Sequence, residues 1–306
     1  MSTTIDTGRT KSKLPSTLAT PLGMGGVISA AVTTRQPFIL PKWSTLNEKY
    51  GVLADESWGE KHGKDFYLGY YGIGIGGSRS IGVGSSGIEA RKVNQHKTTD
   101  GNAFYPIPFL AREITNDVDP EIRKNFRLRV VRPVGDKVYV FYYLKKIGFT
   151  EFDPSVKIGS KDPETGNETE RPYVPKEEDL SPTPYELTSV NAIPLTNEYV
   201  NATGKMDLSL TESDLTEIKN VCRILFNDSS VAAINEMYLA YGVETTHDGQ
   251  IGESGTVNYQ ELQSAVAAYV ITEAWARDAN ANTKMPWFFH YGNSLPLLID
   301  QSQLAG

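Results

Sequence analysis

Two neighbouring segments near the middle of the chain constrain its fold more than any other feature. Phe126, Leu128 and Val130 alternate with arginines, and residues 138–144 (VYVFYYL) are β-branched or aromatic almost throughout. The RPVGD sequence between them is typical of a turn, so the two segments predict a β-hairpin. Because the second strand has no polar face, either another layer of this chain or a neighbouring subunit must cover both of its sides.

The clearest helix signal lies over residues 211–226. Thr211 and Asp214 have the spacing of a capping box, and Leu210 and Leu215 occupy the positions of a hydrophobic staple. The predicted helix has one apolar face at helical spacing, made of Leu215, Ile218, Val221, Cys222, Leu225 and Phe226. Cys222 is the only cysteine, and we expect it to pack in the core, because a catalytic thiol needs a partly exposed, electropositive setting.

These signals predict a β-rich α+β fold, with an antiparallel sheet or sandwich core, a few helices and long loops. Four regions are expected along the chain. Residues 1–36 contain proline and glycine without apolar periodicity and predict an extended N-terminal arm. Residues 37–150 predict a β-rich domain with a glycine-rich loop and the hairpin. Residues 151–205 predict an acidic, proline-containing loop region, and residues 206–306 an α+β C-terminal region.

Several shorter segments give less specific signals. Residues 117–124 predict a short helix that has a proline near its first turn. The segment 232–241 (AAINEMYLAY) is followed by Gly242, where we expect a polar turn. Residues 259–276 fit a helix or a strand, with a strand favoured for the later part. The apolar residues within 287–299 fit a core strand or a docking segment.

The segment 66–88 is dense in glycine. Gly72, Gly74 and Gly77 formally match the G-x-G-x-x-G fingerprint of dinucleotide-binding proteins. That fingerprint holds a pyrophosphate only where its last glycine opens a helix, and the SRSIGVG sequence that follows has no helical stripe. We therefore interpret the segment as a glycine-rich loop in which backbones approach closely, at an interface.

Charge is divided unevenly along the chain. Residues 1–146 contain 21 Lys/Arg and 13 Asp/Glu (21 − 13 = +8), whereas residues 147–306 contain 9 and 24 (9 − 24 = −15). Three readings stay open: compositional drift, head-to-tail packing of unlike surfaces of neighbouring subunits, and nucleic-acid contact through the basic half. Nucleic acid is the least favoured partner, because the basic residues are spread along strands and no nucleic-acid motif accompanies them.

No residue pattern predicts catalysis, a cofactor or a metal ion. The four histidines are His62, His96, His247 and His290. They lie far apart and lack a second ligand at zinc spacing. There is no P-loop, and Gly84–Gly87 (GSSG) is one residue short of a nucleophile elbow. Residues 278–289 lack the glycine and glutamate of a calcium loop, and the acidic run 177–179 reads as a solvated face. We therefore predict no catalytic, cofactor-binding or metal-binding residue, and no cofactor.

The sequence also bears on the compartment. Because the sequence contains no run of about 18 apolar residues, we expect no membrane-spanning helix. The N-terminal segment lacks the apolar centre of a secretory signal, so we expect the protein to be made in a reducing cytoplasm. The Asn-x-Ser/Thr sites at Asn167, Asn201 and Asn227 carry little weight, because glycosylation requires secretion.

Four short stretches together carry a resemblance. They are Tyr70–Arg79 (YYGIGIGGSR), Tyr105–Phe109 (YPIPF), the Arg127–Lys146 hairpin and Tyr291–Leu298 (YGNSLPLL). The set is similar to virion structural proteins of large tailed bacteriophages, of the neck, tail or baseplate type. The resemblance implies a non-enzymatic subunit in the virion, assembled in the host cytoplasm as a homo- and hetero-oligomer with other virion structural proteins.

Two other functional hypotheses stay open. A capsid decoration protein or a host-attachment protein would share the β-rich composition. A carbohydrate-active enzyme of the virion is less favoured, since it requires a pocket with two carboxyl groups about 5–10 Å apart, and nothing in the sequence points to one.

Overall fold

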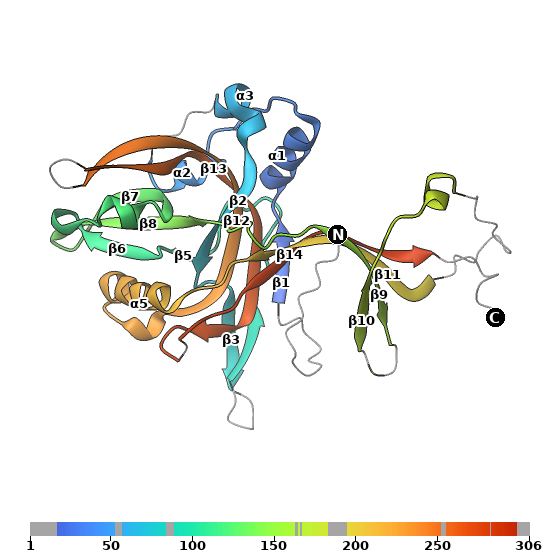
Figure 1. Ribbon diagram of the computed structural model, residues 1–306. Coiled ribbons are helices and arrows are strands. Elements are labelled where there is room, and N and C mark those ends of the chain that lie inside the picture. Colours follow the sequence, from blue (N-terminus) through green and yellow to red (C-terminus); the bar gives the residue numbers. More distant parts are fainter. Residues whose placement is uncertain are drawn as a thin grey trace. The chain divides into compact units, whose positions relative to one another are not determined.

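The chain folds into two compact units (Figure 1). The computed structural model describes residues 17–52, 57–83, 89–162, 165, 167–182, 195–251, 255–281 and 283–298. The larger unit is drawn from the described residues within 17–147 and 208–287, and the smaller unit from those within 148–207 and 288–298. The structure is 51% strand and 21% helix with antiparallel sheets, which confirms the expected β-rich α+β fold class.

The larger unit is built on an eight-stranded antiparallel sheet. Its strands are β1 (Thr17–Pro21), β2 (Tyr67–Gly74), β5 (Pro106–Ile107), β6 (Leu110–Glu113), β7 (Phe126–Val134), β8 (Lys137–Lys146), β12 (Ala233–Ile251) and β13 (Gly255–Asp278). They follow the order β1-β13-β12-β2-β8-β6, with β5 beside β2 and β7 beside β8. Strands β3 (Ser78–Val83) and β4 (Glu89–Val93) form a separate two-stranded sheet.

Short helices accompany this sheet. The α-helices are α1 (Gly23–Thr34), α2 (Leu46–Lys49), α3 (Trp58–His62), α4 (Pro120–Arg123) and α5 (Glu212–Phe226), and the 3-10 helices are η1 (Gly63–Asp65), η2 (Ile114–Asn116) and η4 (Ser229–Val231). The short helix expected over residues 117–124 is confirmed as α4, whose Pro120 occupies the first turn. No helix among the described residues has both the length and the apolar character needed to cross a bilayer.

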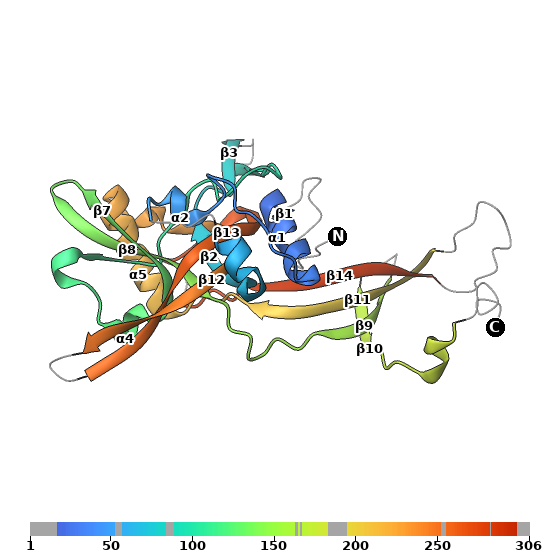
Figure 2. The same ribbon diagram turned by 90° about the horizontal axis from the view of Figure 1, so that it is seen from above.

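The long strands β12 and β13 form the central hairpin of the larger unit and run side by side in both views (Figure 1, Figure 2). The polar turn expected after Gly242 is wrong, because β12 continues to Ile251 and pairs with β13 along its length. Beyond Glu244 the side chains alternate between partly exposed and exposed. The polar residues after Gly242 therefore indicate that this part of the strand is exposed to solvent, and they do not indicate that the strand stops there. Residues 259–276 are strand throughout, within β13.

The hairpin expected in the middle of the chain is confirmed as β7–β8. Residues 140–144 are all buried, so both faces of β8 are covered. Phe141, Tyr143 and Leu144 belong to a core that also takes Val221 from α5 and Val270 from β13. This chain therefore supplies the covering layers itself.

The helix expected over residues 211–226 is confirmed as α5. The hydroxyl of Thr211 accepts a hydrogen bond from the Asp214 amide, and the Asp214 carboxylate accepts one from the Thr211 amide at 3.0 Å, which closes the capping box. Leu215, Ile218 and Cys222 are buried on the predicted face. Burial raises the pKa of the Cys222 thiol to about 11, which agrees with a packing role.

The expected extended arm is wrong for residues 17–34. Residues 17–21 form β1, which pairs with β13, and residues 23–34 form α1. Glycine in this segment permits close packing and does not break structure: a Cβ on Gly25 would lie 2.4 Å from the Cα of Ala268. Residues 1–16 of the expected arm lie outside the described part of the chain.

The smaller unit contains a four-stranded antiparallel sheet of order β10-β9-β11-β14. Its elements are β9 (Ser155–Lys161), β10 (Glu168–Pro172), the 3-10 helix η3 (Glu177–Leu180), β11 (Leu195–Asp207) and β14 (Phe288–Leu298). The expectation that loops dominate residues 151–205 is wrong where β9, β10 and β11 form. β10 is exposed throughout, and polar or charged residues make up much of β9 and β11, so these strands lack the apolar alternation that marks a strand in sequence.

Ion pairs within the larger unit join the basic and acidic halves of the chain. They are Arg112–Glu217, Arg123–Glu261, Arg127–Glu244, Lys145–Asp214 and Lys146–Glu244. Each pair takes its cation from residues 1–146 and its anion from residues 147–306. The uneven charge therefore has a role inside one chain at these positions, a reading the sequence analysis did not include.

Glu244 is the centre of the densest of these contacts. A register shift between Val243 and Glu244 interrupts the pairing of β12 with β13. The Glu244 carboxylate accepts hydrogen bonds from the Tyr67 and Tyr70 hydroxyls at 2.7 and 2.8 Å, and from Arg127 Nε at 2.9 Å. Burial alone would raise the pKa of Glu244, but hydrogen bonds from Lys146, Tyr67 and Tyr70 outweigh it and leave the pKa below 4.5.

We expect Glu244→Gln to lower the free energy of unfolding by about 2 kcal/mol at neutral pH, the scale for hydrogen bonds to a charged group. Because the folded-state pKa of Glu244 lies below its ordinary value of 4.5, this stabilisation is present above pH 4.5 and is lost as pH falls below it. Urea unfolding of both proteins across this range measures it. Glu113→Gln, which removes an exposed pair with Lys137, is the control and should change little. A deficit that persists unchanged at low pH would contradict the assignment.

The single thiol provides a second test. Because Cys222 is buried and the pKa of its thiol is raised to about 11, we expect a thiol reagent at about pH 8 to label the native protein only at the rate of unfolding. Denaturant should make labelling immediate. In a Ser213→Cys variant, which adds a thiol on an exposed position of α5, one equivalent should react at once. Rapid labelling of native Cys222 would exclude the buried packing.

Candidate functional site

A narrow two-stranded ribbon projects from the larger unit. Among the described strands, β3 and β4 pair only with each other, from Ser78 opposite Val93 to Val83 opposite Glu89. Ser78 and Val93 at the base are buried, but most other side chains are exposed, including Ile81 at 55% and Val83 at 69%. In Figure 1 β3 runs away from the large sheet. We call residues 78–83 and 89–93 the ribbon.

The ribbon places like charges opposite one another. Arg79 lies directly across from Lys92, an arrangement that destabilises an isolated strand pair. No described carboxylate forms an ion pair with either cation, whereas the neighbouring Arg91 pairs with Glu89 at 3.1 Å. The ribbon thus presents uncompensated positive charge together with aliphatic side chains.

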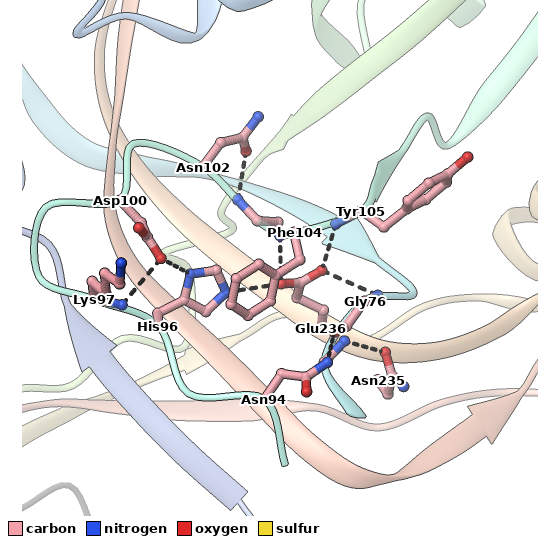
Figure 3. A network of polar contacts seen from close by, with 12 residues as sticks. Gly76, Asn94, His96, Lys97, Asp100, Asn102, Phe104, Tyr105, Asn235 and Glu236 are labelled. Carbon is pink, nitrogen blue, oxygen red and sulfur yellow. Dashed lines mark hydrogen bonds and ion pairs between the residues drawn. The ribbon is translucent and has the colours of Figure 1, made fainter. Parts of the chain in front are cut away.

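Two side chains of β12 hold the base of the ribbon (Figure 3). The Gly77 amide donates a hydrogen bond to Asn235 Oδ1 at 2.8 Å, and Asn235 Nδ2 donates to Ser78 Oγ at 2.9 Å. The Gly76 amide donates to Glu236 Oε2 at 3.2 Å. The turn from β2 into β3 is therefore fixed to the central hairpin by side chains and not by a backbone ladder.

The Glu236 carboxylate is completely buried and fully occupied. Besides Gly76, it accepts hydrogen bonds from the Phe104 amide at 2.8 Å and the Tyr105 amide at 3.2 Å, and it faces His96 Nε2 at 2.9 Å. Its exposed fraction is 0%. A buried carboxylate is tolerated only when polar groups replace its water, and here three backbone amides and the His96 ring, from three segments, do so.

His96 links this carboxylate to a second one (Figure 3). Its Nδ1 lies 2.9 Å from Asp100 Oδ2, an atom that also accepts a hydrogen bond from the Lys97 amide at 3.0 Å. The imidazole stacks on the Phe104 ring, with 3.7 Å between the ring centres. His96 therefore lies between two carboxyl groups, one at each ring nitrogen. We call Asn235, Glu236, His96 and Asp100 the anchor.

The glycines of the turn are required by this close packing. A Cβ on Gly77 would lie 2.0 Å from the carbonyl oxygen of Asn235, and one on Gly76 would lie 2.8 Å from the Tyr105 amide. The close backbone approach expected from the sequence is therefore confirmed, whereas the expected glycine-rich loop is wrong for residues 67–74 and 78–83, which are strands. Gly72 and Gly74 lie in β2 and Gly77 precedes β3, so the dinucleotide fingerprint has strands where it would need a helix.

The histidines considered in the sequence lie at separate places in the structure. His96 belongs to the anchor. The His247 ring stacks on the ring of Tyr259. His290 lies in β14, where burial lowers the pKa of its imidazole. Among the described residues, no group of three or more His, Cys, Asp or Glu side chains is placed to hold a metal ion.

The other patterns tested in the sequence are local features. The Asn280 amide donates to Asp278 Oδ1 at 2.8 Å, which is an Asx turn. The acidic run 177–179 lies in the exposed helix η3, as a solvated face would. Residues 84–87, Asn282 and the side chain of His62 lie outside what the structure describes.

The sequence analysis missed Asn235 and Glu236. The available signal was two adjacent polar residues inside the apolar segment AAINEMYLAY. Buried polar side chains must have hydrogen-bond partners, so this pair predicts an internal contact, although the sequence alone does not name the partners. Chemically, the anchor positions backbone: each Glu236 oxygen already has hydrogen-bond partners, and the Glu236 carboxylate and the His96 ring are shielded from solvent.

The chain was also compared with known proteins. Residues 8–305 match a family described as a family of unknown function (DUF7208). The chain belongs to this family. No curated protein and no solved structure is significantly similar to it. The ribbon and the anchor both lie within the part of this DUF7208 chain that the family covers.

We expect Gly77→Ala to destabilise the protein by about 1–3 kcal/mol, the usual cost of overpacking, because its Cβ would meet the backbone of Asn235. Hydrogen exchange at the ribbon amides should accelerate, since the turn loses its fixed position. Gly101→Ala, where a Cβ meets nothing within 4 Å, is the matched control and should leave both measurements unchanged. Equal behaviour of the two variants would show that the anchor does not hold the ribbon.

Proposed function

We propose that this chain is a non-enzymatic structural subunit of a tailed-phage particle, located in the virion at the tail, baseplate or neck. The resemblance of the four short stretches supports this class of protein. The observation that carries the proposal is the ribbon, whose exposed aliphatic side chains and unpaired cations fit a contact with another virion protein.

The energetics of the ribbon favour a role in association. An isolated two-stranded ribbon is at best marginally stable in water, and this one also opposes Arg79 to Lys92. A partner surface with carboxylates and an apolar centre would bury Ile81 and Val83 and compensate the two cations. The fitting partner is therefore an acidic virion protein surface with exposed aliphatic side chains.

The anchor supports the same role. A rigid element loses less conformational entropy on binding than a mobile one. Glu236 and Asn235 fix the base of the ribbon through three hydrogen bonds to Gly76, Gly77 and Ser78. Two more hydrogen bonds, from the Phe104 and Tyr105 amides, hold the Glu236 carboxylate itself in place. The buried network thus presents the ribbon in one orientation.

We expect the double variant Ile81→Ser with Val83→Ser to fold normally and to lose incorporation into particles, because both side chains are exposed in the free chain. Circular dichroism checks the fold, and quantitative mass spectrometry of purified particles checks incorporation. Val27→Ser, at an exposed position of α1, is the matched control. Normal incorporation of the ribbon variant would remove the observation on which the proposal rests.

The copy number in intact particles separates the proposal from a capsid decoration protein. A tail, baseplate or neck subunit should occur in a small number set by the symmetry of the tail axis. Antibody labelling should then mark one vertex of the particle or its tail. Labelling distributed over the whole head would overturn the proposed location, and absence from purified particles would overturn the proposed function.

A further inference from the structure

The turn between α1 and α2 displays two large apolar side chains. Trp43 is 76% exposed and Ile39 is 65% exposed. Trp43 also has a φ of 67°, in the left-handed region that side chains other than glycine rarely adopt. We call residues 39–43 the Trp43 turn.

The capping box of α2 imposes this conformation. Glu48 Oε1 accepts a hydrogen bond from the Trp43 amide at 2.8 Å, and Glu48 Oε2 accepts from the Thr45 amide at 3.1 Å. The Thr45 hydroxyl in turn accepts from the Glu48 amide at 3.1 Å. A strained backbone that is held in place beside an exposed aromatic side chain is characteristic of a functional surface, and tryptophan is enriched among the residues that dominate binding energy.

Three exposed cations lie near the Trp43 turn in the sequence. Arg35, Lys42 and Lys49 are exposed, and no described carboxylate forms an ion pair with them. Lys42 Nζ lies 5.2 Å from the centre of the Trp43 ring. This differs from the cations of the same half that pair with Glu217, Glu244 and Glu261. The turn therefore combines exposed apolar side chains with three nearby cations in sequence, against the one carboxylate of Glu48 that holds its backbone.

The smaller unit carries a surface of the opposite kind. In residues 173–180, Val174 is 73% exposed and Leu180 is 86% exposed. Three exposed acidic residues, Glu177–Asp179, lie between them, and Lys176 forms an ion pair with Glu178 at 3.0 Å, which leaves the segment a net charge of 1 − 3 = −2. The Asp179 carboxylate accepts hydrogen bonds from the Tyr173 hydroxyl and the Lys176 amide, which orders the segment. We call residues 173–180 the acidic segment.

We propose that the Trp43 turn of one copy docks on the acidic segment of a second copy. Trp43 and Ile39 would pack against Val174 and Leu180, and the cations would face Glu177–Asp179. Because the two surfaces differ, the contact is heterologous and repeats from copy to copy, which closes a ring or extends a filament. The inference rests on the proposed role as an assembling subunit but uses a surface separate from the ribbon.

Trp43→Gly tests the first surface. Glycine relieves the left-handed strain, so the melting temperature should be unchanged or higher, while self-association measured by analytical ultracentrifugation should weaken at least about tenfold. Trp43→Asn, which also tolerates this backbone conformation, should behave alike. Ile114→Ser, at another exposed apolar position, should associate like the wild type. Unchanged association of both Trp43 variants would overturn the proposal.

Mixing two defective chains tests the pairing itself. The variant Val174→Asp with Leu180→Asp lacks one surface and Trp43→Gly lacks the other, so each alone should be monomeric. Their equimolar mixture retains one intact contact and should form dimers and nothing larger. A monomeric mixture, or a wild type that stays monomeric at all concentrations, would overturn the proposal. If ribbon variants still lose incorporation in that case, the proposed function stands without this contact.

Discussion

The burial of one carboxylate, that of Glu236, is the constraint on which the arrangement of the larger unit depends. Removing a charge from water is costly unless hydrogen bonds replace the lost solvent. Glu236 meets this requirement with the amides of Gly76, Phe104 and Tyr105 and the ring of His96. Three chain segments must therefore converge on β12, and the position of the ribbon follows from that convergence.

Local signals in the sequence were enough to predict the β7–β8 hairpin, α4 and α5, because alternation, a proline in the first turn and a capping box act over a few residues. The anchor could not be predicted in this way, since His96 and Glu236 are 140 residues apart. The helix α1 was not predicted for a related reason. Gly25 alone indicates a helix breaker, and its packing against Ala268, which requires glycine there, is a contact between residues far apart in the sequence.

The uneven charge of the two halves of the sequence becomes interpretable only once the fold shows which charged side chains lie together. Within one chain, cations such as Arg112 and Arg127 find Glu217 and Glu244, so much of the uneven charge is compensated by folding. Cations without a described ion-pair partner include Arg79 and Lys92 on the ribbon and Arg35, Lys42 and Lys49 near the Trp43 turn in the sequence, and both places also carry exposed apolar side chains. Unpaired charge beside exposed apolar surface is the combination that specific association uses.

The larger unit is built from two stretches of chain that are separated in the sequence by the smaller unit, so the protein can associate with partners only late in its synthesis. Its sheet needs β1 and β2 from the N-terminal part and β12 and β13 from residues 233–278. During synthesis, Gly76 and Gly77 emerge long before Asn235 and Glu236, and contacts over such sequence separations form late. The ribbon is therefore not held in its final orientation until most of the chain has left the ribosome, which delays its encounter with partners until the subunit is nearly complete.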